Sequence, residues 1–210
     1  MASGLVNKTL VKLIFEEPVD DYTILDVGCG AGALSFIVAE KAKSVVGIDI
    51  SEEAIMSAKK RARENTFFYV IDADTADYTA LGRIDMVVSH LCMSNRIIEN
   101  SYYVLPKEGK IAFACFHAKH LIEGGRRSRF SYTRKEMKNV LEKTGFTVEY
   151  LEVESEKIPF KNMDEAIAVI GHKKAGKWQS DGRLQNLQNY IDKGGRSLTK
   201  SILVGKARKE

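Results

Sequence analysis

The sequence predicts an α/β fold: one domain whose mostly parallel sheet is covered by helices on both faces. Short aliphatic runs alternate along the chain with segments of helical periodicity. These runs are apolar at nearly every position, as in parallel strands that are buried on both faces. The length of 210 residues allows one such domain with a sizeable core and leaves too little chain for two.

Seven runs predict strands. Five of them are aliphatic and read as buried parallel strands: 23–28, 44–50, 67–72, 84–90 and 110–116. Two later runs close the chain, an alternating segment over 146–154 with one wetter face and a last strand over 201–209.

Helical patterns separate these runs. The first 18 residues read as an amphipathic helix and not a signal peptide, because lysines and glutamates interrupt the apolar positions. Ser51 is a suitable N-cap for a helix over 52–64, and residues 32–43 carry a broad apolar face. Capping-box patterns at 133–136 and 162–165 open two later helices. We therefore expect residues 155–198 to form a helical insertion before the last strand of a single 1–210 domain.

Composition narrows the class of protein. The chain has 44% hydrophobic and 29% charged residues, and no run approaches the roughly 20 apolar residues of a membrane span. Three widely spaced cysteines predict neither a disulfide framework nor a zinc site and favour the reducing cytoplasm. We expect no metal and no membrane partner. The net charge of +4 permits an anionic substrate without requiring nucleic acid.

The most informative segment is LDVGCGAG at 25–32, which joins the first strand to the first sheet-flanking helix. Glycines let the backbone turn sharply and approach a ligand closely, and a helix N-terminus offers free N–H groups to an anion. The carboxylate of S-adenosylmethionine (SAM) and a dinucleotide pyrophosphate both suit such a bend. The spacing is G-x-G-x-G, whereas the nicotinamide fingerprint is G-x-G-x-x-G. Asp26, two residues before the first glycine, suits a positively charged ligand such as SAM; it could instead tether the loop.

This segment closely resembles motif I of the class I SAM-dependent methyltransferases, and three more stretches at the ends of the following strands resemble the next motifs: VVGIDIS, IDADTADY and VVSHLCM. The resemblance covers roughly residues 1–154 and 200–209. It implies a Rossmann-like, seven-stranded, mostly parallel sheet with an antiparallel last strand. It also implies a cytoplasmic enzyme that transfers a methyl group from SAM and releases S-adenosylhomocysteine (SAH).

By the same resemblance, Asp49 binds the ribose hydroxyls, Asp72 contacts the adenine amino group and the Ala73 N–H contacts a ring nitrogen, with Asp74 as an alternative to Asp72. Ser89 borders the methionine end. The residues expected at the cofactor are Asp26, Gly28, Cys29, Gly30, Gly32, Asp49, Ile50, Asp72, Ala73 and Ser89. Asp49 and Asp72 could each alternatively be a solvated strand-end residue or a cap.

Methyl transfer needs alignment of the reacting atoms more than it needs a base, and a base only when the acceptor is protonated. His90, after the fourth strand, is the candidate catalytic residue; a structural hydrogen-bonding role is the alternative. His117, Arg126 and Arg127 are candidate substrate-binding residues, because arginines suit a carboxylate or phosphate on the acceptor. The alternative for the arginines is a solvated basic loop.

The class of methyl acceptor is inferred mainly from motifs that the sequence does not contain. No N-P-P-Y-like tetrapeptide follows the fourth strand and no cysteine stands in a Pro-Cys context, which disfavours nucleic-acid N-methylation and pyrimidine C5-methylation. The 155–198 insertion and the N-terminal helix resemble the lid of small-molecule methyltransferases. We expect a small-molecule acceptor. The alternatives are an RNA or protein methyltransferase, a non-catalytic SAM-binding module and, least favoured, a nicotinamide-dependent oxidoreductase.

Overall fold

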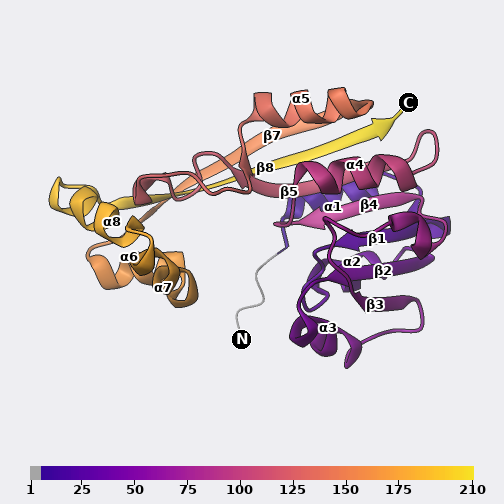
Figure 1. The fold of residues 1–210 in the computed structure, drawn as a ribbon, viewed down its shortest axis with the longest axis horizontal. Helices are drawn as coiled ribbons and strands as arrows, with labels where there is room; N and C mark the ends of the chain where they lie inside the picture. The colour runs from indigo at the N-terminus through magenta and orange to yellow at the C-terminus, as the bar shows by residue number, and fades with distance from the viewer. Residues whose placement is uncertain (1–5) are drawn as a thin grey trace. The chain divides into compact units, whose positions relative to one another are not determined.

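A mixed eight-stranded sheet organises the computed structural model, which describes residues 6–210 (Figure 1). The strand order is β3-β2-β1-β4-β5-β8-β7, and the short β6 pairs with β5 outside this path. The strands are β1 (Thr23–Val27), β2 (Ser44–Asp49), β3 (Thr66–Val70), β4 (Met86–His90), β5 (Lys110–His117), β6 (Ser131–Tyr132), β7 (Phe146–Pro159) and β8 (Ser197–Lys209).

Strand β1 lies at the centre of the parallel part. It pairs with β2 on one side, where Leu25 is level with Val46, and with β4 on the other, where Leu25 is level with Val87. The side chains of β1 are buried from Ile24 to Val27, as expected for a strand covered on both faces. Because the chain leaves β1 for β2 and later returns to β4 on the other side, the sheet has its topological switch point at the end of β1.

The last strands run antiparallel, as predicted. The Lys209 N–H donates to the Gly109 carbonyl at 2.9 Å, and the Leu121 N–H donates to the Thr199 carbonyl at 2.7 Å, so β8 runs backwards along the β5 segment. The predicted mostly parallel, helix-flanked α/β sheet with an antiparallel last strand is confirmed. The two-residue β6 is an addition that the sequence pattern did not predict. Both β7 and β8 are longer than predicted.

The helices are α1 (Lys8–Phe15), α2 (Ala33–Val38), α3 (Glu52–Lys59), α4 (Asn95–Val104), α5 (Arg134–Thr144), α6 (Met163–Ile170), α7 (His172–Ser180) and α8 (Arg183–Asp192), with short 3-10 turns η1 (Val19–Asp21), η2 (Tyr78–Leu81) and η3 (Ile122–Gly124). Ser51 and Asn162 cap α3 and α6 as predicted, each accepting a backbone N–H three residues on. Within residues 6–210, no helix is both long and apolar enough to cross a membrane.

Helices α4 and α7 were not predicted. Ser94 caps α4, and its buried face consists of Ile97, Ile98 and Ser101, so the signal was present but short. Helix α7 buries only Ala175 and Trp178, and such a polar segment has too few apolar positions to show helical periodicity.

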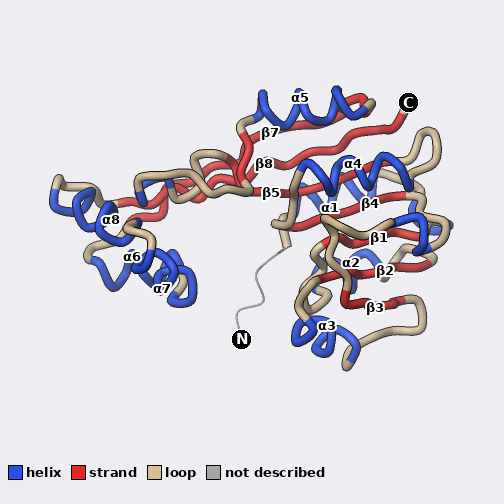
Figure 2. Tube along the Cα trace, viewed as in Figure 1, coloured by secondary structure: helices blue, strands red, loops and turns tan. Residues whose placement is uncertain are grey.

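The chain divides into two compact units. Unit 1 consists of residues 1–115, 134–152 and 204–210, and unit 2 consists of 116–133 and 153–203. Unit 2 holds α6, α7 and α8, coloured as helices in Figure 2, and has a hydrophobic core of its own that includes Trp178 and Leu187. The segment 116–133 thus clusters with the expected 155–198 insertion. The role of the insertion as a lid in a single domain stays a prediction.

A buried ionic network ties the end of α1 to the sheet of unit 1. Lys206 on β8 is 6% exposed, and its Nζ donates to Glu17 at 2.8 Å and to Glu16 at 3.1 Å. The Nζ of Lys110 on β5 reaches the other Glu17 oxygen at 2.8 Å and Glu149 at 3.3 Å. Burial acts to raise the pKa of Glu17, but the hydrogen bonds from Lys110 and Lys206 outweigh burial and lower it.

We expect Glu17→Gln to lower the free energy of unfolding by about 3 kcal/mol near neutral pH, because it leaves two largely buried ammonium groups without their shared carboxylate. Since the folded-state pKa lies below the ordinary 4.5, this contribution is present above pH 4.5 and disappears as the pH falls through the folded pKa. Urea unfolding at neutral and acidic pH measures it. Glu16→Gln is the matched control, since Glu16 contacts the same Lys206 but is 44% exposed. Equal losses of unfolding free energy in Glu17→Gln and Glu16→Gln would contradict a special contribution of the carboxylate that Lys110 and Lys206 share.

Candidate functional site

The bend after β1 has the backbone that its glycines predict. Gly28, Gly30 and Gly32 have φ values of 71°, 53° and 84°, all in the left-handed region that favours glycine. The N–H groups of Gly28 and Cys29 donate to the carbonyl of Ile48 on β2, at 2.8 and 3.0 Å. The bend is therefore fastened to the end of β2, the neighbouring parallel strand.

The three glycines differ in what surrounds the position of a Cβ atom. A Cβ on Gly28 would lie 2.3 Å from the Cβ of Cys92, and one on Gly32 would lie 2.8 Å from the ring of Phe36. A Cβ on Gly30 would meet no protein atom within 4 Å. Gly28 and Gly32 thus allow close packing within the protein, whereas Gly30 borders open space, where a ligand has room to approach the backbone.

Asp49, the last residue of β2, is hydrogen-bonded to this bend. Its Oδ2 accepts the Gly30 N–H at 2.8 Å and its Oδ1 accepts the Ser51 N–H at 2.9 Å. Each carboxylate oxygen can accept a second hydrogen bond, so Asp49 keeps acceptor capacity for a ligand. Ile50 follows with 70% of its surface exposed, an unusual state for a large apolar side chain at the end of a buried strand.

Asp26 is the most unusual residue of the site. It is 1% exposed, its Oδ2 accepts the Ser35 hydroxyl at 2.5 Å, and its buried Oδ1 has no partner among the described residues. Burial raises the pKa of Asp26 to about 7; the hydrogen bonds of Ser35 oppose this shift and the nearby Asp49 carboxylate adds to it. Sequence reasoning missed Ser35, whose only signal was its place in the first turn after the glycines.

The turn after β3 carries Asp72 and Ala73. The strand ends at Val70, so Asp72 is an exposed turn residue whose Oδ1 accepts the Asp74 N–H at 2.9 Å. The Ala73 carbonyl accepts the Tyr78 hydroxyl at 2.9 Å and an Asn100 amide N–H at 3.1 Å. The backbone of this turn is thus fixed from two sides, as a backbone contact to a base would require.

Ser89 and His90 end β4. The buried Ser89 hydroxyl lies within hydrogen-bonding distance of the carbonyls of Val27, at 2.9 Å, and of Cys92, so Ser89 links the ends of β4 and β1. His90 Nε2 accepts the Asn7 N–H at 3.3 Å, and burial lowers the pKa of the imidazole. His90 is therefore a neutral histidine whose Nε2 already accepts a hydrogen bond. The predicted ligand roles of Ser89 and His90 stay predictions.

The remaining candidates belong to unit 2. His117 Nδ1 lies 2.9 Å from the Ser201 hydroxyl. Arg126 forms an ion pair with Asp181 at 2.9 Å, and Arg127 donates to the Ser131 carbonyl at 2.6 Å. The structure thus brings the predicted donor-binding residues together at the strand ends of unit 1, while His117, Arg126 and Arg127 have partners in unit 2.

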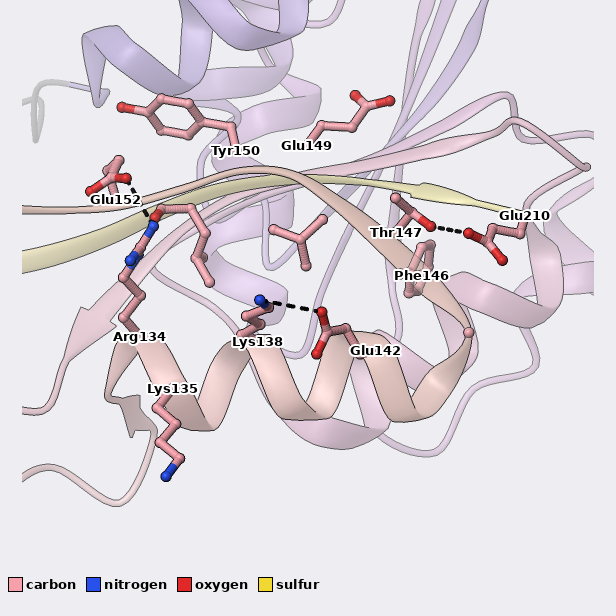
Figure 3. A pocket seen from close by; sticks show the side chains of 13 residues that line it. Arg134, Lys135, Lys138, Glu142, Phe146, Thr147, Glu149, Tyr150, Glu152 and Glu210 are labelled. Atoms are coloured by element: carbon pink, nitrogen blue, oxygen red, sulfur yellow. Dashed lines mark hydrogen bonds and ion pairs between the residues drawn. The ribbon is translucent and has the colours of Figure 1, made fainter.

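A cavity in unit 1 does not involve any predicted site residue. It has a volume of about 900 Å³ and lies between α5 and β7, the edge strand of the sheet. Figure 3 shows two ion pairs on its walls, Arg134 with Glu152 at 3.0 Å and Lys138 with Glu142 at 3.6 Å. Since β7 lies four strand positions from β1, this cavity is separate from the glycine bend. Across residues 6–210, no cluster of three or more His, Cys, Asp or Glu side chains is suited to a metal ion.

Comparison with known proteins identifies the family. A family model described as a methyltransferase domain matches residues 18–200, most of the chain. The chain belongs to this methyltransferase family. The motifs at the ends of its strands, which resemble those of class I SAM-dependent methyltransferases, agree with this membership.

Two curated relatives are similar to parts of this chain. The methyltransferase is 33% identical over 94 residues to the 23S rRNA (uracil(1939)-C(5))-methyltransferase of Shewanella frigidimarina, a match covering 41% of this chain and 21% of the relative. It is 44% identical over 71 residues to the aklanonic acid methyltransferase of Streptomyces sp. strain C5, covering 30% of this chain and 32% of the relative. The chain therefore matches only a fifth to a third of the length of these relatives.

The solved structure is a SAM-dependent methyltransferase from Mesorhizobium loti, with a TM-score of 0.64, 18% identity, and coverage of 98% of this chain and 99% of the other. At this identity the likeness shows the fold alone.

The packing at Gly28 gives a prediction for the methyltransferase. Gly28→Ala should destabilise the fold by several kcal/mol, because the new Cβ overlaps Cys92 and also strains a left-handed backbone. Gly30→Ala is the matched control and should cost only about 1–2 kcal/mol, the backbone strain alone. Urea unfolding of both variants without ligand measures the difference. Similar losses would show that Cys92 moves away at little cost.

Proposed function

We propose that this methyltransferase binds SAM at the glycine bend of unit 1 and transfers its methyl group to a small-molecule acceptor. The observation that carries the donor site is the buried, unpartnered oxygen of Asp26 beside a bend that is open at Gly30. A buried carboxylate oxygen without a partner is costly, and a cationic ligand group removes that cost.

The residues present fit the chemistry of the donor. SAM has an ammonium and a sulfonium group, which suit the carboxylate of Asp26, and a ribose diol, which suits the remaining acceptor capacity of Asp49. The fixed turn at Asp72 and Ala73 suits the edge of the adenine, and the exposed Ile50 offers it an apolar surface. When bound, SAM supplies an activated methyl group on a sulfonium.

The protein's part in the reaction is mainly to position its substrates. Alignment of the acceptor atom with the methyl carbon and sulfur supplies much of the rate enhancement, and a base is needed only for a protonated acceptor. His90 is neutral and lies at the end of β4, so it is suited to orient an acceptor or, after release from Asn7, to take a proton.

A small-molecule acceptor is favoured over RNA by the sequence SHLCM at 89–93, where nucleic-acid N-methylating members have N-P-P-Y-like motifs. Arg126 and Arg127 are also partly engaged by Asp181 and the Ser131 carbonyl. The second candidate function, RNA methylation, is supported by the rRNA-modifying relative and by a pI near 8.8.

An acceptor panel with SAH formation as the readout tests the proposal. Turnover of small organic acids, phenols or amines, with no turnover of RNA, is the expected result. Turnover confined to RNA, together with binding that weakens steeply with salt, would transfer the assignment to the second candidate.

Asp49→Ala should weaken SAM binding by about 1–3 kcal/mol, because the ribose hydroxyls lose their buried acceptor. Isothermal titration calorimetry measures the affinity, and thermal unfolding without ligand separates this loss from any loosening of the bend. Asp20→Ala, at an exposed aspartate of η1, is the matched control and should leave the affinity unchanged. An affinity equal to that of the wild type would place the ribose elsewhere.

SAM affinity should rise with pH up to about 7 and then level off. The pKa of Asp26 is raised from 3.8 to about 7, so the ligand-free protein holds a neutral carboxyl below pH 7. The free energy of unfolding of the ligand-free protein therefore falls as the pH rises from 3.8 to about 7. A cationic donor prefers the carboxylate, so binding releases a proton and weakens up to about tenfold per unit below pH 7.

Calorimetry at several pH values, in buffers of different ionisation enthalpy, measures both the affinity and the proton release. Asp26→Asn should remove the pH dependence and also stabilise the ligand-free protein above pH 7. A pH dependence that survives in Asp26→Asn would mean that another group titrates on binding.

A further inference from the structure

Unit 2 contains a cavity that the donor site does not use. Its volume is about 600 Å³, within the usual range for small-molecule sites. Its walls come from the loop at 126–130, from the segment around Phe116 and from helix α7, all within unit 2. Six cationic side chains line it: Arg126, Arg127, Arg129, Lys174, Lys177 and Arg183.

Flat aromatic walls accompany these cations. The guanidinium of Arg183 lies 4.9 Å from the ring centroid of Trp178, and that of Arg129 lies 4.5 Å from the ring of Phe130. Lys174 Nζ lies 5.2 Å from the ring of Phe116. Stacked guanidinium planes and rings form surfaces suited to a planar ligand. Phe130 is 47% exposed, so a ligand in the cavity would cover apolar surface.

The positive charge of the cavity is only partly neutralised. Asp181 forms ion pairs with Arg126 at 2.9 Å and Arg183 at 2.7 Å. Within residues 6–210, no carboxylate pairs with Lys174, Lys177 or Arg129. Burial, with the positive charges of Arg183 and Lys200, lowers the pKa of Lys174. The cavity therefore has an excess of positive charge that an anion would offset.

One buried donor is also unpaired. Trp178 is 1% exposed, and its Nε1–H has no acceptor among the described residues. The great majority of buried donors in proteins are satisfied, so this one is an exception. Trp178 lines the cavity, whereas its Nε1 atom is buried beneath the surface.

We propose that this cavity binds a small planar anion, an aromatic carboxylate or an aromatic phosphate monoester. The anionic group contacts Lys174, Lys177 and Arg129, and the ring stacks against the aromatic walls. The cations are gathered around one cavity of about 600 Å³ that is also lined by aromatic rings, a size and lining that suit a small planar ligand better than a long polyanion. Binding needs no methyl donor, so a failure of this proposal would leave the proposed function intact.

The sequence offers a direct probe, because Trp178 is the single tryptophan of the chain. Tryptophan fluorescence is titrated with phenyl phosphate, with benzoate, with inorganic phosphate and with neutral benzyl alcohol. The expected result is a saturable change with phenyl phosphate or benzoate, at concentrations about tenfold or more below those needed for inorganic phosphate or benzyl alcohol. No saturable change with either aromatic anion would overturn the proposal.

Variants test the residues. Lys174→Gln and Lys177→Gln should each weaken phenyl phosphate binding about tenfold, the loss of one charge-assisted hydrogen bond. Lys157→Gln, on an exposed part of β7 in unit 2, is the matched control and should bind as the wild type does. Equal binding by all three variants would overturn the proposal. A single-stranded RNA that displaces the probe with a steep salt dependence and binds far more tightly would also overturn it, in favour of a polyanion site.

Discussion

The burial of one carboxylate, that of Asp26, is the constraint on which the donor end of unit 1 depends. The residue lies on β1 between β2 and β4, level with Gly47 and Val88, and the strand pairs in parallel on both sides. Ser35 supplies one hydrogen bond, because the glycine bend directs the chain back so that the first turn of α2 reaches Asp26. An apolar residue at position 26 would avoid the desolvation cost. A costly group held at the switch point of a parallel sheet is what a ligand site requires, and fold stability alone does not explain it.

The three glycines of the bend look equivalent in the sequence but have different roles in the structure. Gly28 makes room for Cys92, which follows β4, and Gly32 makes room for Phe36, so both serve the packing around the strand ends. Gly30 alone borders open space, and its N–H is held by Asp49. The backbone that faces the ligand is therefore fixed by a carboxylate that is itself expected to bind the ligand. If Asp49 binds the donor as proposed, it couples donor recognition to the geometry of the loop.

The sequence predicted the strands and the glycine bend because each depends on local pattern. In residues 23–27, Ile24, Leu25 and Val27 form a short aliphatic run that is buried on both faces, which is the local pattern of a parallel strand. The sequence did not predict contacts between residues that are distant in the chain. Arg126 pairs with Asp181 across 55 positions (181 − 126), and no periodicity relates the two. The polar α7 was missed for a related reason, since its stability comes from packing Ala175 and Trp178 into a core built by residues far along the chain. Asp72 was predicted to end a strand, whereas the strand ends two residues earlier, at Val70.

The net charge of the chain is +4, but the two units have opposite electrostatic environments at their candidate sites. Unit 1 presents carboxylates at its strand ends, Asp26 and Asp49, which raise the cost of any anion there and favour a ligand with positive charge. Unit 2 presents six cations around an aromatic cavity, and Asp181 pairs with two of them, Arg126 and Arg183. Under the two proposals, the first unit would favour a cationic methyl donor and the second an aromatic anion. Because like charges repel, this separation of charge would discriminate between the two ligands without any difference in size or shape.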